Sequence, residues 1–373
     1  MAGISKEELK KHLFVCILCG GGGKRLWPRS RKQTPKQFID LFGDSTVFEQ
    51  TVSRAKKLTT TDKIYIVTSY DYIDNVLNQG KDLLLRNIVA EPMAKNTALA
   101  MAMGAVNIFA KDPEAVIINL TSDHAVSPRN IFEQDMYLAA KTAYDSQQIV
   151  TVGIKPTFPH TGFGYIKVGK KEMLAGKKAV YRVLAFTEKP DYHKAQIFLN
   201  SGNYYWNTSL YTWKASVIIK TIKRFAPELA KLVERFQQAM GKASEAAIVR
   251  RIYKDAEDIS IDYAVSERAD NLVLLPASFS WDDIGDWDVV YQRSGKDSDG
   301  NAIIKYGKKG GYVVFESKNN LIHFNDHLLA LVGVNNLIVV DTEDALLICH
   351  RKEAEKVKKI VNKLKEARRL EYL

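Results

Sequence analysis

The sequence has few cysteines and no long apolar run, and each shortage excludes a class of protein. Only three of its 373 residues are cysteine. So few thiols cannot build the disulfide framework of a small secreted protein, and they favour a reducing, cytoplasmic compartment. Nowhere does the chain offer the roughly 20 consecutive apolar residues that cross a bilayer. We therefore expect neither a membrane anchor nor a signal peptide.

Two of the cysteines, Cys16 and Cys19, form a C-x-x-C pair. This spacing occurs in redox and zinc sites, but a zinc site of this type needs a second pair of ligands, and the sequence has none. On a strand, residues three apart also point to opposite faces of the sheet. The pair is therefore interpreted as two core residues.

The chain is basic, with a net charge of +11, which raises the question of nucleic acid. Many of the cations lie in residues 351–369, where Val357, Ile360, Val361 and Leu364 recur at helical spacing. That pattern predicts an amphipathic helix with a solvated cationic face. No nucleic-acid recognition motif is present, so no nucleic-acid partner is expected. A basic balance also suits a protein whose ligands carry phosphate groups.

The first 293 residues alternate between apolar strands and helices, which predicts an α/β fold with a mostly parallel sheet. Thr46 and Glu49 form a capping box, and Asn96 is expected to cap a later helix. Residues 260–267 are a further helix candidate. The expected strands are 14–19, 64–68, 87–91, 115–120, 149–154, 162–167, 181–190 and 204–213.

Short strands separated by turns follow a Gly-, Asp- and Ser-rich linker, and they continue until the terminal helix. They are expected at 311–315, 319–323, 328–332, 336–340 and 345–349. We therefore predict two domains, a larger α/β domain at 1–293 and a β-rich domain at 301–373.

An apolar strand near the start of the chain ends in four glycines, Gly20, Gly21, Gly22 and Gly23, and then cations. Glycines let the backbone approach a polyphosphate, and consecutive N–H groups can converge on an anion. The loop is not a Walker A motif, because Arg25 stands where Ser or Thr is required. It does not match the G-x-G-x-x-G dinucleotide fingerprint in either register.

With its continuation into Leu-Trp-Pro and Pro-Lys-Gln-Phe, this stretch resembles the sugar-1-phosphate nucleotidyltransferases, and within them the mannose-1-phosphate guanylyltransferases (GDP-mannose pyrophosphorylases). The resemblance covers the chain from Val15 to about Trp287, with a weaker likeness at 341–347. Further motifs occur in the family's order at 91–98 (Glu-Pro-x-x-Lys-Asn-Thr-Ala), 122–124 (Ser-Asp-His), 162–166, 186–190 (Phe-Thr-Glu-Lys-Pro), 206–207, 260–264 (Ser-Ile-Asp-Tyr-Ala) and 281–287.

The resemblance implies a Rossmann-like nucleotidyltransferase domain followed by a small domain like a short β-helix. It implies that GTP and mannose 1-phosphate react to give GDP-mannose and pyrophosphate, with Mg²⁺ as cofactor. The sugar phosphate is already ionised at neutral pH, so this attack on the α-phosphorus needs no general base. What must be supplied is alignment of two anions and neutralisation of charge.

The family's site residues carry over to matching positions of this sequence. The resemblance assigns Arg25, Lys36, Asp123 and Asp283 to catalysis, and the same two aspartates to the metal. Asp282 is an adjacent competitor for the metal, and His124 is either a phosphate contact or a turn residue. The nucleotide is assigned to Gly20, Gly21, Gly22, Gly23, Lys24, Glu91, Pro92, Asn96, Thr97 and Ser122, and the sugar phosphate to Gly164, Glu188, Lys189 and Asn207.

Some positions depart from the family pattern, and some alternatives stay open. Gly22 and Lys24 stand where Ser or Thr is usual, Arg29 replaces a common Leu, and Lys95 a common Arg. The same chemistry with another sugar 1-phosphate or with UTP or dTTP is an alternative, as is a non-catalytic nucleotide-sugar-binding relative. The β-rich domain suggests a homodimer, and the isomerase domain of longer relatives is expected to be missing.

Overall fold

A computed structural model describes residues 3–43 and 45–373, and these fall into two compact units. The first unit contains residues 3–20, 51–122 and 126–281, and the second contains residues 21–43, 45–50, 123–125 and 282–373. The units thus interleave along the chain. The predicted boundary between residues 293 and 301 stays a prediction, since it follows sequence order and these units follow contacts.

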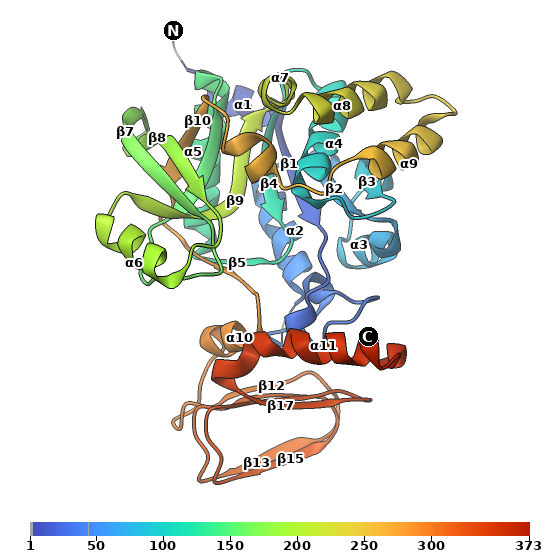
Figure 1. Cartoon of the computed structure of the whole chain (residues 1–373), viewed down its shortest axis with the longest axis vertical. Helices are drawn as coiled ribbons and strands as arrows, with labels where there is room; N and C mark the ends of the chain where they lie inside the picture. The colour runs from blue at the N-terminus through green and yellow to red at the C-terminus, as the bar shows by residue number, and fades with distance from the viewer. Residues whose placement is uncertain (1–2, 44) are drawn as a thin grey trace. The chain divides into compact units, whose positions relative to one another are not determined.

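A nine-stranded mixed sheet forms the centre of the first unit, in the order β3-β2-β1-β4-β9-β6-β10-β8-β7 (Figure 1). Strands β8 and β9 run antiparallel to their neighbours, and the other strands share one direction, as an α/β fold predicts. The strands are β1 (Leu13–Cys19), β2 (Ile64–Ser69), β3 (Ile88–Glu91), β4 (Val116–Thr121), β6 (Ile149–Ile154), β7 (Tyr165–Ala175), β8 (Lys178–Thr187), β9 (Tyr204–Lys214) and β10 (Leu272–Pro276).

Helices cover this sheet, and β1 is buried along its whole length. Helix α4, rich in alanine, packs on β1, β2 and β3, and α5 packs on β4, β6, β7 and β9. Cys16 and Cys19 are fully buried in β1, as predicted for core residues. The helices before residue 256 are α1 (Lys6–His12), α2 (Val47–Leu58), α3 (Ile73–Gln79), α4 (Asn96–Lys111), α5 (Arg129–Ser146), α6 (Tyr192–Ser201), α7 (Ala215–Phe225), α8 (Pro227–Ala239) and α9 (Glu245–Asp255).

The starts of two helices test the capping predictions, and residues 260–267 test a predicted helix. Before α2, the Thr46 N–H donates to Glu49 Oε2 at 2.8 Å and the Glu49 N–H to Thr46 Oγ1 at 3.1 Å, so the capping box is confirmed. Asn96 is not the cap of α4. It is the first helical residue, with φ 59°, and Lys95 holds the cap position without a side-chain bond. The predicted helix at 260–267 is a single π-helical turn, Asp262–Ser266.

The C-terminal part of the second unit consists of short strands at 302–350 that wind in a β-helix-like way, called here the coil (Figure 1). One sheet has the order β12-β14-β16-β17, and a smaller sheet pairs β13 with β15. Strands β5 (His124–Ser127) and β11 (Ser280–Asp283) form a further two-stranded sheet. The remaining elements are α10 (Trp287–Arg293), β12 (Ala302–Lys305), β13 (Gly311–Phe315), β14 (Leu321–Phe324), β15 (Leu328–Val332), β16 (Leu337–Asp341), β17 (Leu346–His350) and α11 (Val357–Glu366).

Buried asparagines join successive turns of this coil. Asn301 Oδ1 accepts from both the N–H and the Nδ2 of Asn320 at 3.1 Å, and Asn320 Oδ1 accepts from the Leu337 N–H at 2.8 Å. These bonds satisfy backbone groups at the turns, which a buried loop would otherwise leave unpaired. The coil is the β-rich structure that the sequence predicts, although β12 was not foreseen.

The core of the second unit includes residues from the start of the chain. Leu26, Trp27, Ile39 and Leu41 are buried with residues of α10, β12, β14, β16 and α11. The Trp27 Nε1–H donates to the Tyr372 carbonyl at 2.8 Å, and Trp27 O accepts from Trp287 Nε1 at 2.9 Å. In the part of the chain that the structure describes, no helix has the length and apolar character to cross a membrane.

Candidate active site

The candidate site begins where the strand order of the first unit reverses. Strand β1 pairs with β2 on one side and with β4 on the other. After β3 the chain crosses back to place β4 beside β1, so the strand order reverses between β1 and β4. Ligands of open α/β sheets bind outside the carboxyl ends of strands at such a point. Gly20 follows β1 directly, and Ser122 follows β4, its N–H bonded to Leu18 O at 3.0 Å. Among the residues that the structure describes, the buried Ser122 hydroxyl has no hydrogen-bond partner.

The glycine loop has the open backbone that the sequence predicts. Gly21 and Gly23 adopt φ values of 91° and 57°, which favour glycine. A Cβ at Gly20, Gly21 or Gly22 would meet no atom within 4 Å. At Gly23, by contrast, a Cβ would lie 2.6 Å from Lys36 Cβ, so this glycine makes room for the lysine stem. Lys24 and Arg25 follow in a 3₁₀ turn, Lys24–Leu26.

Lys36 joins the two predicted metal-binding aspartates within the second unit. Its ammonium lies 2.9 Å from Asp123 Oδ2 and 3.0 Å from Asp283 Oδ1, and it donates to Ile284 O at 3.1 Å. Burial would lower the pKa of Lys36, but the two carboxylates outweigh it and hold that pKa above its usual value. Burial would likewise raise the pKa of Asp123, yet Lys36 and His124 hold it below its usual value.

The structure distinguishes between the two adjacent aspartates. Asp283 contacts Lys36, whereas the Asp282 carboxylate pairs with Arg293. His124 begins β5, and its Nε2 lies 3.8 Å from Asp123 Oδ1. Asp283, rather than Asp282, is therefore placed beside the second predicted metal ligand.

The donor set of this cluster fits a hard divalent cation. Asp123 and Asp283 each bring an oxygen to within about 3 Å of one ammonium, so two carboxylates already converge on a single positive charge. Mg²⁺ is bound by one or two carboxylates, with water and substrate phosphates completing its shell. Among residues 3–43 and 45–373 no group of three or more His, Cys, Asp and Glu side chains forms a metal cage.

The predicted guanine-binding residues lie at the end of β3 in the first unit. Glu91 is the last residue of the strand, with Pro92 next, and Glu91 Oε1 accepts from the Tyr253 hydroxyl at 3.2 Å. Burial raises the pKa of Glu91 to about 7, although the Tyr253 hydrogen bond opposes this. Glu91 is therefore a carboxyl group that changes charge near neutral pH.

Residues 256–266, called here the 256–266 segment, hold the start of helix α4. Lys95 Nζ donates to Ala256 O at 2.6 Å, and the Ala98 N–H donates to Ile259 O at 3.2 Å. Thr97 Oγ1 accepts from the Ile261 N–H at 2.9 Å. Asn96 Oδ1 accepts from the Thr97 N–H at 2.9 Å. Of the predicted nucleotide-binding residues, Thr97 is thus bonded to the segment, and Asn96 is bonded to Thr97.

The predicted sugar-phosphate residues come together at β7, β8 and β9. The Asn207 N–H donates to Gly164 O at 2.8 Å, and a Cβ at Gly164 would lie 2.5 Å from Glu188 Oε2. A side chain at position 164 would push the flexible end of Glu188 away from this backbone. Lys189 Nζ pairs with Glu188 Oε1 at 2.6 Å, and the Lys189 side chain is largely exposed.

Asp262 supports this group, and the sequence reasoning gave it no role. Its Oδ1 accepts from Asn207 Nδ2 at 2.8 Å and from the Tyr211 hydroxyl at 2.7 Å. Asn207 Oδ1 accepts from the Ser209 N–H at 3.1 Å, so the orientation of the carboxamide is fixed at both ends. Burial raises the pKa of Asp262, against the hydrogen bonds from Tyr211 and Asn207. The signal was an aspartate inside the apolar motif at 260–264.

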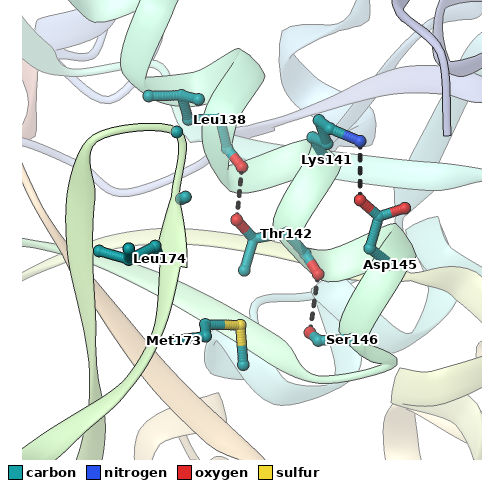
Figure 2. A pocket seen from close by; sticks show the side chains of 9 residues that line it. Leu138, Lys141, Thr142, Asp145, Ser146, Met173 and Leu174 are labelled. Carbon is teal, nitrogen blue, oxygen red and sulfur yellow. Dashed lines mark hydrogen bonds and ion pairs between the residues drawn. The ribbon is translucent and has the colours of Figure 1, made fainter. Parts of the chain in front are cut away.

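The hollows of the first unit include one that lies apart from the predicted site residues and one that borders the 256–266 segment. Figure 2 shows one of about 270 Å³, beside α5 and the β7–β8 turn, where Lys141 pairs with Asp145 and Leu174 lies opposite. None of the predicted site residues lines it. The other, of about 800 Å³, lies against the 256–266 segment, with Ile259 and Leu229 among its apolar lining.

Known proteins are similar to this chain over most of its length. The sequence model described as "Nucleotidyl transferase" matches residues 15–300, and the one described as "MannoseP isomerase/GMP-like beta-helix domain" matches residues 310–364. A mannose-1-phosphate guanylyltransferase of Klebsiella pneumoniae is 33% identical over 363 residues, which cover 96% of this chain and 75% of that relative. The alginate biosynthesis protein AlgA of Pseudomonas putida is 34% identical over 362 residues, covering 96% and 73%.

A solved structure is similar over nearly the whole chain. It is described as mannose-1-phosphate geranyltransferase from Thermus thermophilus, with a TM-score of 0.82 and 26% sequence identity. The alignment covers 95% of this chain and 99% of that one. Both the sheet and the β-rich coil therefore have counterparts in a single known protein.

Proposed function

This chain belongs to the nucleotidyl transferase family, and we propose that it is a mannose-1-phosphate guanylyltransferase. An oxygen of mannose 1-phosphate forms a bond to the α-phosphorus of GTP, and the bond from that phosphorus to the bridging oxygen of the β-phosphate breaks. The products are GDP-mannose and pyrophosphate. The observation that carries the proposal is the convergence of Asp123, Asp283 and Lys36 beside a glycine loop, in a chain whose relatives are named for this activity.

The residues of the second unit fit the triphosphate. Gly21 and Gly22 leave the backbone open to phosphate oxygens, and Arg25 adds positive charge next to them. Asp123 and Asp283 would hold Mg²⁺, which neutralises negative charge on phosphate oxygens when it is bound. No residue has to remove a proton from the sugar phosphate, because its phosphate oxygen is already ionised.

The residues of the first unit fit the base and the sugar. An ionised Glu91 can accept hydrogen bonds from the guanine N1–H and N2 amine. Gly164 lets the sugar approach the backbone, Asn207 and Glu188 can bond its hydroxyl groups, and Lys189 supplies a cation for its phosphate. Catalysis would then come from orientation and from fixed charge rather than from a nucleophilic side chain.

Pyrophosphate release tests the function directly. With Mg²⁺ present, GTP and mannose 1-phosphate should give pyrophosphate, and neither substrate alone should. A panel of UTP, dTTP and ATP against glucose and heptose 1-phosphates covers the alternative substrates. Asp283→Ala should lower kcat at least a hundredfold, whereas Asp282→Ala, whose carboxylate pairs with Arg293, should keep most of the activity. No turnover with any pair would leave only a binding protein.

A homodimer formed through the coil is a further part of the proposal. On β13 and β15 the side chains of Val313, Phe315, Leu328 and Val332 are all more than half exposed. An apolar sheet face of this kind favours association. Sedimentation velocity should show a dimer that Phe315→Glu with Val332→Glu converts to monomer, while Leu174→Glu, which alters an exposed leucine of the first unit, should not. A monomeric wild type would contradict this.

We also place the reaction in the cytoplasm, where the thiols of Cys16, Cys19 and Cys349, which form no disulfide, would stay reduced. Fractionation of cells that produce the protein should recover the activity in the soluble cytoplasmic fraction.

A further inference from the structure

The Lys36 ammonium has no donor left for a substrate. An ammonium group carries three N–H donors, and the three acceptors Asp123 Oδ2, Asp283 Oδ1 and Ile284 O lie 2.9, 3.0 and 3.1 Å from it. In this state Lys36 cannot also bind a phosphate oxygen, which is the role that the family resemblance implies for it. The two roles require two positions of the side chain.

The observed position is built into the fold. Lys36 begins the 3₁₀ turn Lys36–Phe38, and its stem passes Gly23 so closely that a Cβ there would lie 2.6 Å from it. Only 12% of its side chain is exposed. Long surface lysines are normally solvated and mobile, so this restraint marks a specific contact rather than a chance ion pair.

Charge balance explains why a cation is held there. The two carboxylates carry two negative charges, and Lys36 supplies one positive charge between them. A divalent cation bound by the same oxygens would meet an ammonium already in that place, and two cations at such a distance repel strongly in a partly buried site. The metal and the ammonium therefore compete for Asp123 and Asp283.

We infer that Lys36 is the resident counterion of the Asp123–Asp283 pair and that a divalent cation displaces it, which frees the ammonium to bind phosphate. The inference rests on the proposed metal site. It makes metal binding and phosphate binding a single event, because the arriving ion releases the side chain that the triphosphate needs. Without metal, the same lysine keeps two facing carboxylates from repelling each other.

Metal titrations of the protein without substrates test the exchange. Mn²⁺ binding is followed by electron paramagnetic resonance for wild type, Lys36→Met and the control Lys318→Met. Lys318 also pairs with one aspartate of the second unit, Asp299 at 3.4 Å, but on an exposed surface. Lys36→Met should bind Mn²⁺ at least tenfold more tightly than wild type, and Lys318→Met should match wild type. Equal or weaker binding by Lys36→Met would overturn the inference.

In Lys36→Met, turnover should fall while the affinity for metal rises. Lys36→Met should release pyrophosphate more slowly even though it binds metal more tightly, because it has lost the cation for phosphate. A residue that only supported the aspartates would lose both properties together. If the wild type shows no turnover but the metal affinities change as expected, the proposed function fails while the exchange stands.

A wild-type experiment covers the case in which Lys36→Met does not fold. Brief acetylation of amines, read by mass spectrometry, should modify Lys36 several-fold faster when Mn²⁺ is added, with Lys318 as internal reference. Unchanged or slower modification of Lys36 would contradict its displacement.

Discussion

Glu91 lies at the end of β3, where burial raises the pKa of its carboxyl group to about 7. A carboxyl group with this pKa is largely neutral at pH 6 and largely ionised at pH 8. Only the ionised form can accept hydrogen bonds from guanine on both oxygens. Protonation of Glu91 also affects stability. The free energy of unfolding falls as pH rises from 4.5 to about 7, because the folded state holds this proton more tightly than the unfolded state does.

We expect the affinity for GTP to rise between pH 6 and pH 8. Below the pKa of Glu91, each rise of one pH unit should increase this affinity by up to about tenfold. Calorimetric titrations at several pH values would measure it. Glu91→Gln should bind GTP more weakly at pH 8 and should lose this part of the pH dependence. An equally steep dependence in Glu91→Gln would assign it to another group.

His323 is a buried residue of β14 that no part of the proposed reaction uses. Within residues 3–43 and 45–373 neither ring nitrogen makes a well-formed hydrogen bond, although the Asp40 backbone acts to raise the pKa of the ring, and the ring lies near Trp287 and Tyr306. Burial, with a smaller effect of the Arg29 charge, lowers the pKa of His323 to about 3. The folded state therefore resists protonation of a group that protonates freely once the chain unfolds.

We expect His323→Phe to raise the free energy of unfolding by about 1 kcal/mol at pH 7, since it removes two unpaired polar atoms from the core. In the wild type this residue should cost stability progressively as pH falls from 6.5 towards 3, because the unfolded state then binds the extra proton. Urea unfolding should show that the free energy of unfolding changes less between pH 7 and pH 5 in His323→Phe than in the wild type. A large loss of stability at pH 7 would indicate an unseen partner of the ring.

At the scale of elements, the 256–266 segment connects two groups of predicted ligands within the first unit. It bonds the start of α4 through Ile259 and Ile261, and it bonds Asn207 through Asp262. The hollow of about 800 Å³ lies against it, so the segment is not packed on every side. An element with these contacts can transmit a shift at the nucleotide residues to the sugar residues.

We expect Asp262→Ala to raise the KM for mannose 1-phosphate by about tenfold, because the Asn207 carboxamide loses the acceptor that orients it. Asp262→Asn should have a smaller effect, since its amide oxygen still accepts. Tyr211→Phe, which removes only the other partner of Asp262, serves as the matched control. Steady-state kinetics with each substrate varied would separate the effects. An equal rise in the KM for GTP would mean that Asp262 supports the whole unit.

The elements themselves were largely predictable. Apolar runs such as β1 and β4 have few alternatives in an α/β chain, and the capping box fixed the start of α2. Asn96 was wrong as a cap because it is already the first residue of α4, and the Ala98 N–H bonds instead to Ile259 O of the distant 256–266 segment. Local patterns do not contain such partners.

Site residues that lie in motifs were also predictable, whereas their partners from distant parts of the sequence were not. Motifs identified Lys36, Asp123 and Asp283, and the structure joins them. The support given by Tyr253 to Glu91 was missed, because these residues lie 162 positions apart and a lone tyrosine in a helix indicates only packing. Arg29, noted as an unusual replacement, has a partner that sequence could not supply: its guanidinium lies 3.6 Å from the centre of the Tyr306 ring.

At the scale of the whole molecule, the second unit takes its core from both ends of the sequence. Leu26, Trp27, Ile39 and Leu41 are buried with α10, α11 and the coil. A coil without them would expose the apolar surface that they cover. The predicted division at residues 293–301 would separate these partners.

We expect a fragment of residues 282–373 to unfold with little cooperativity, since part of its core is missing. The same fragment joined to residues 21–50 by a flexible linker should show a sharp thermal transition. Circular dichroism of both fragments would measure the difference. A sharp transition in the shorter fragment would show that the coil is sufficient by itself.

The bond from Trp27 to the Tyr372 carbonyl has a consequence for how the protein is made. Trp27, shortly after the glycine loop, is synthesised early, but its partners Trp287 and Tyr372 follow 260 and 345 residues later. The sheet of the first unit can form during translation, as units of a growing chain do. The segment around Trp27 must wait, so a nascent chain cannot complete the packing beside its glycine loop before residue 287 has been added.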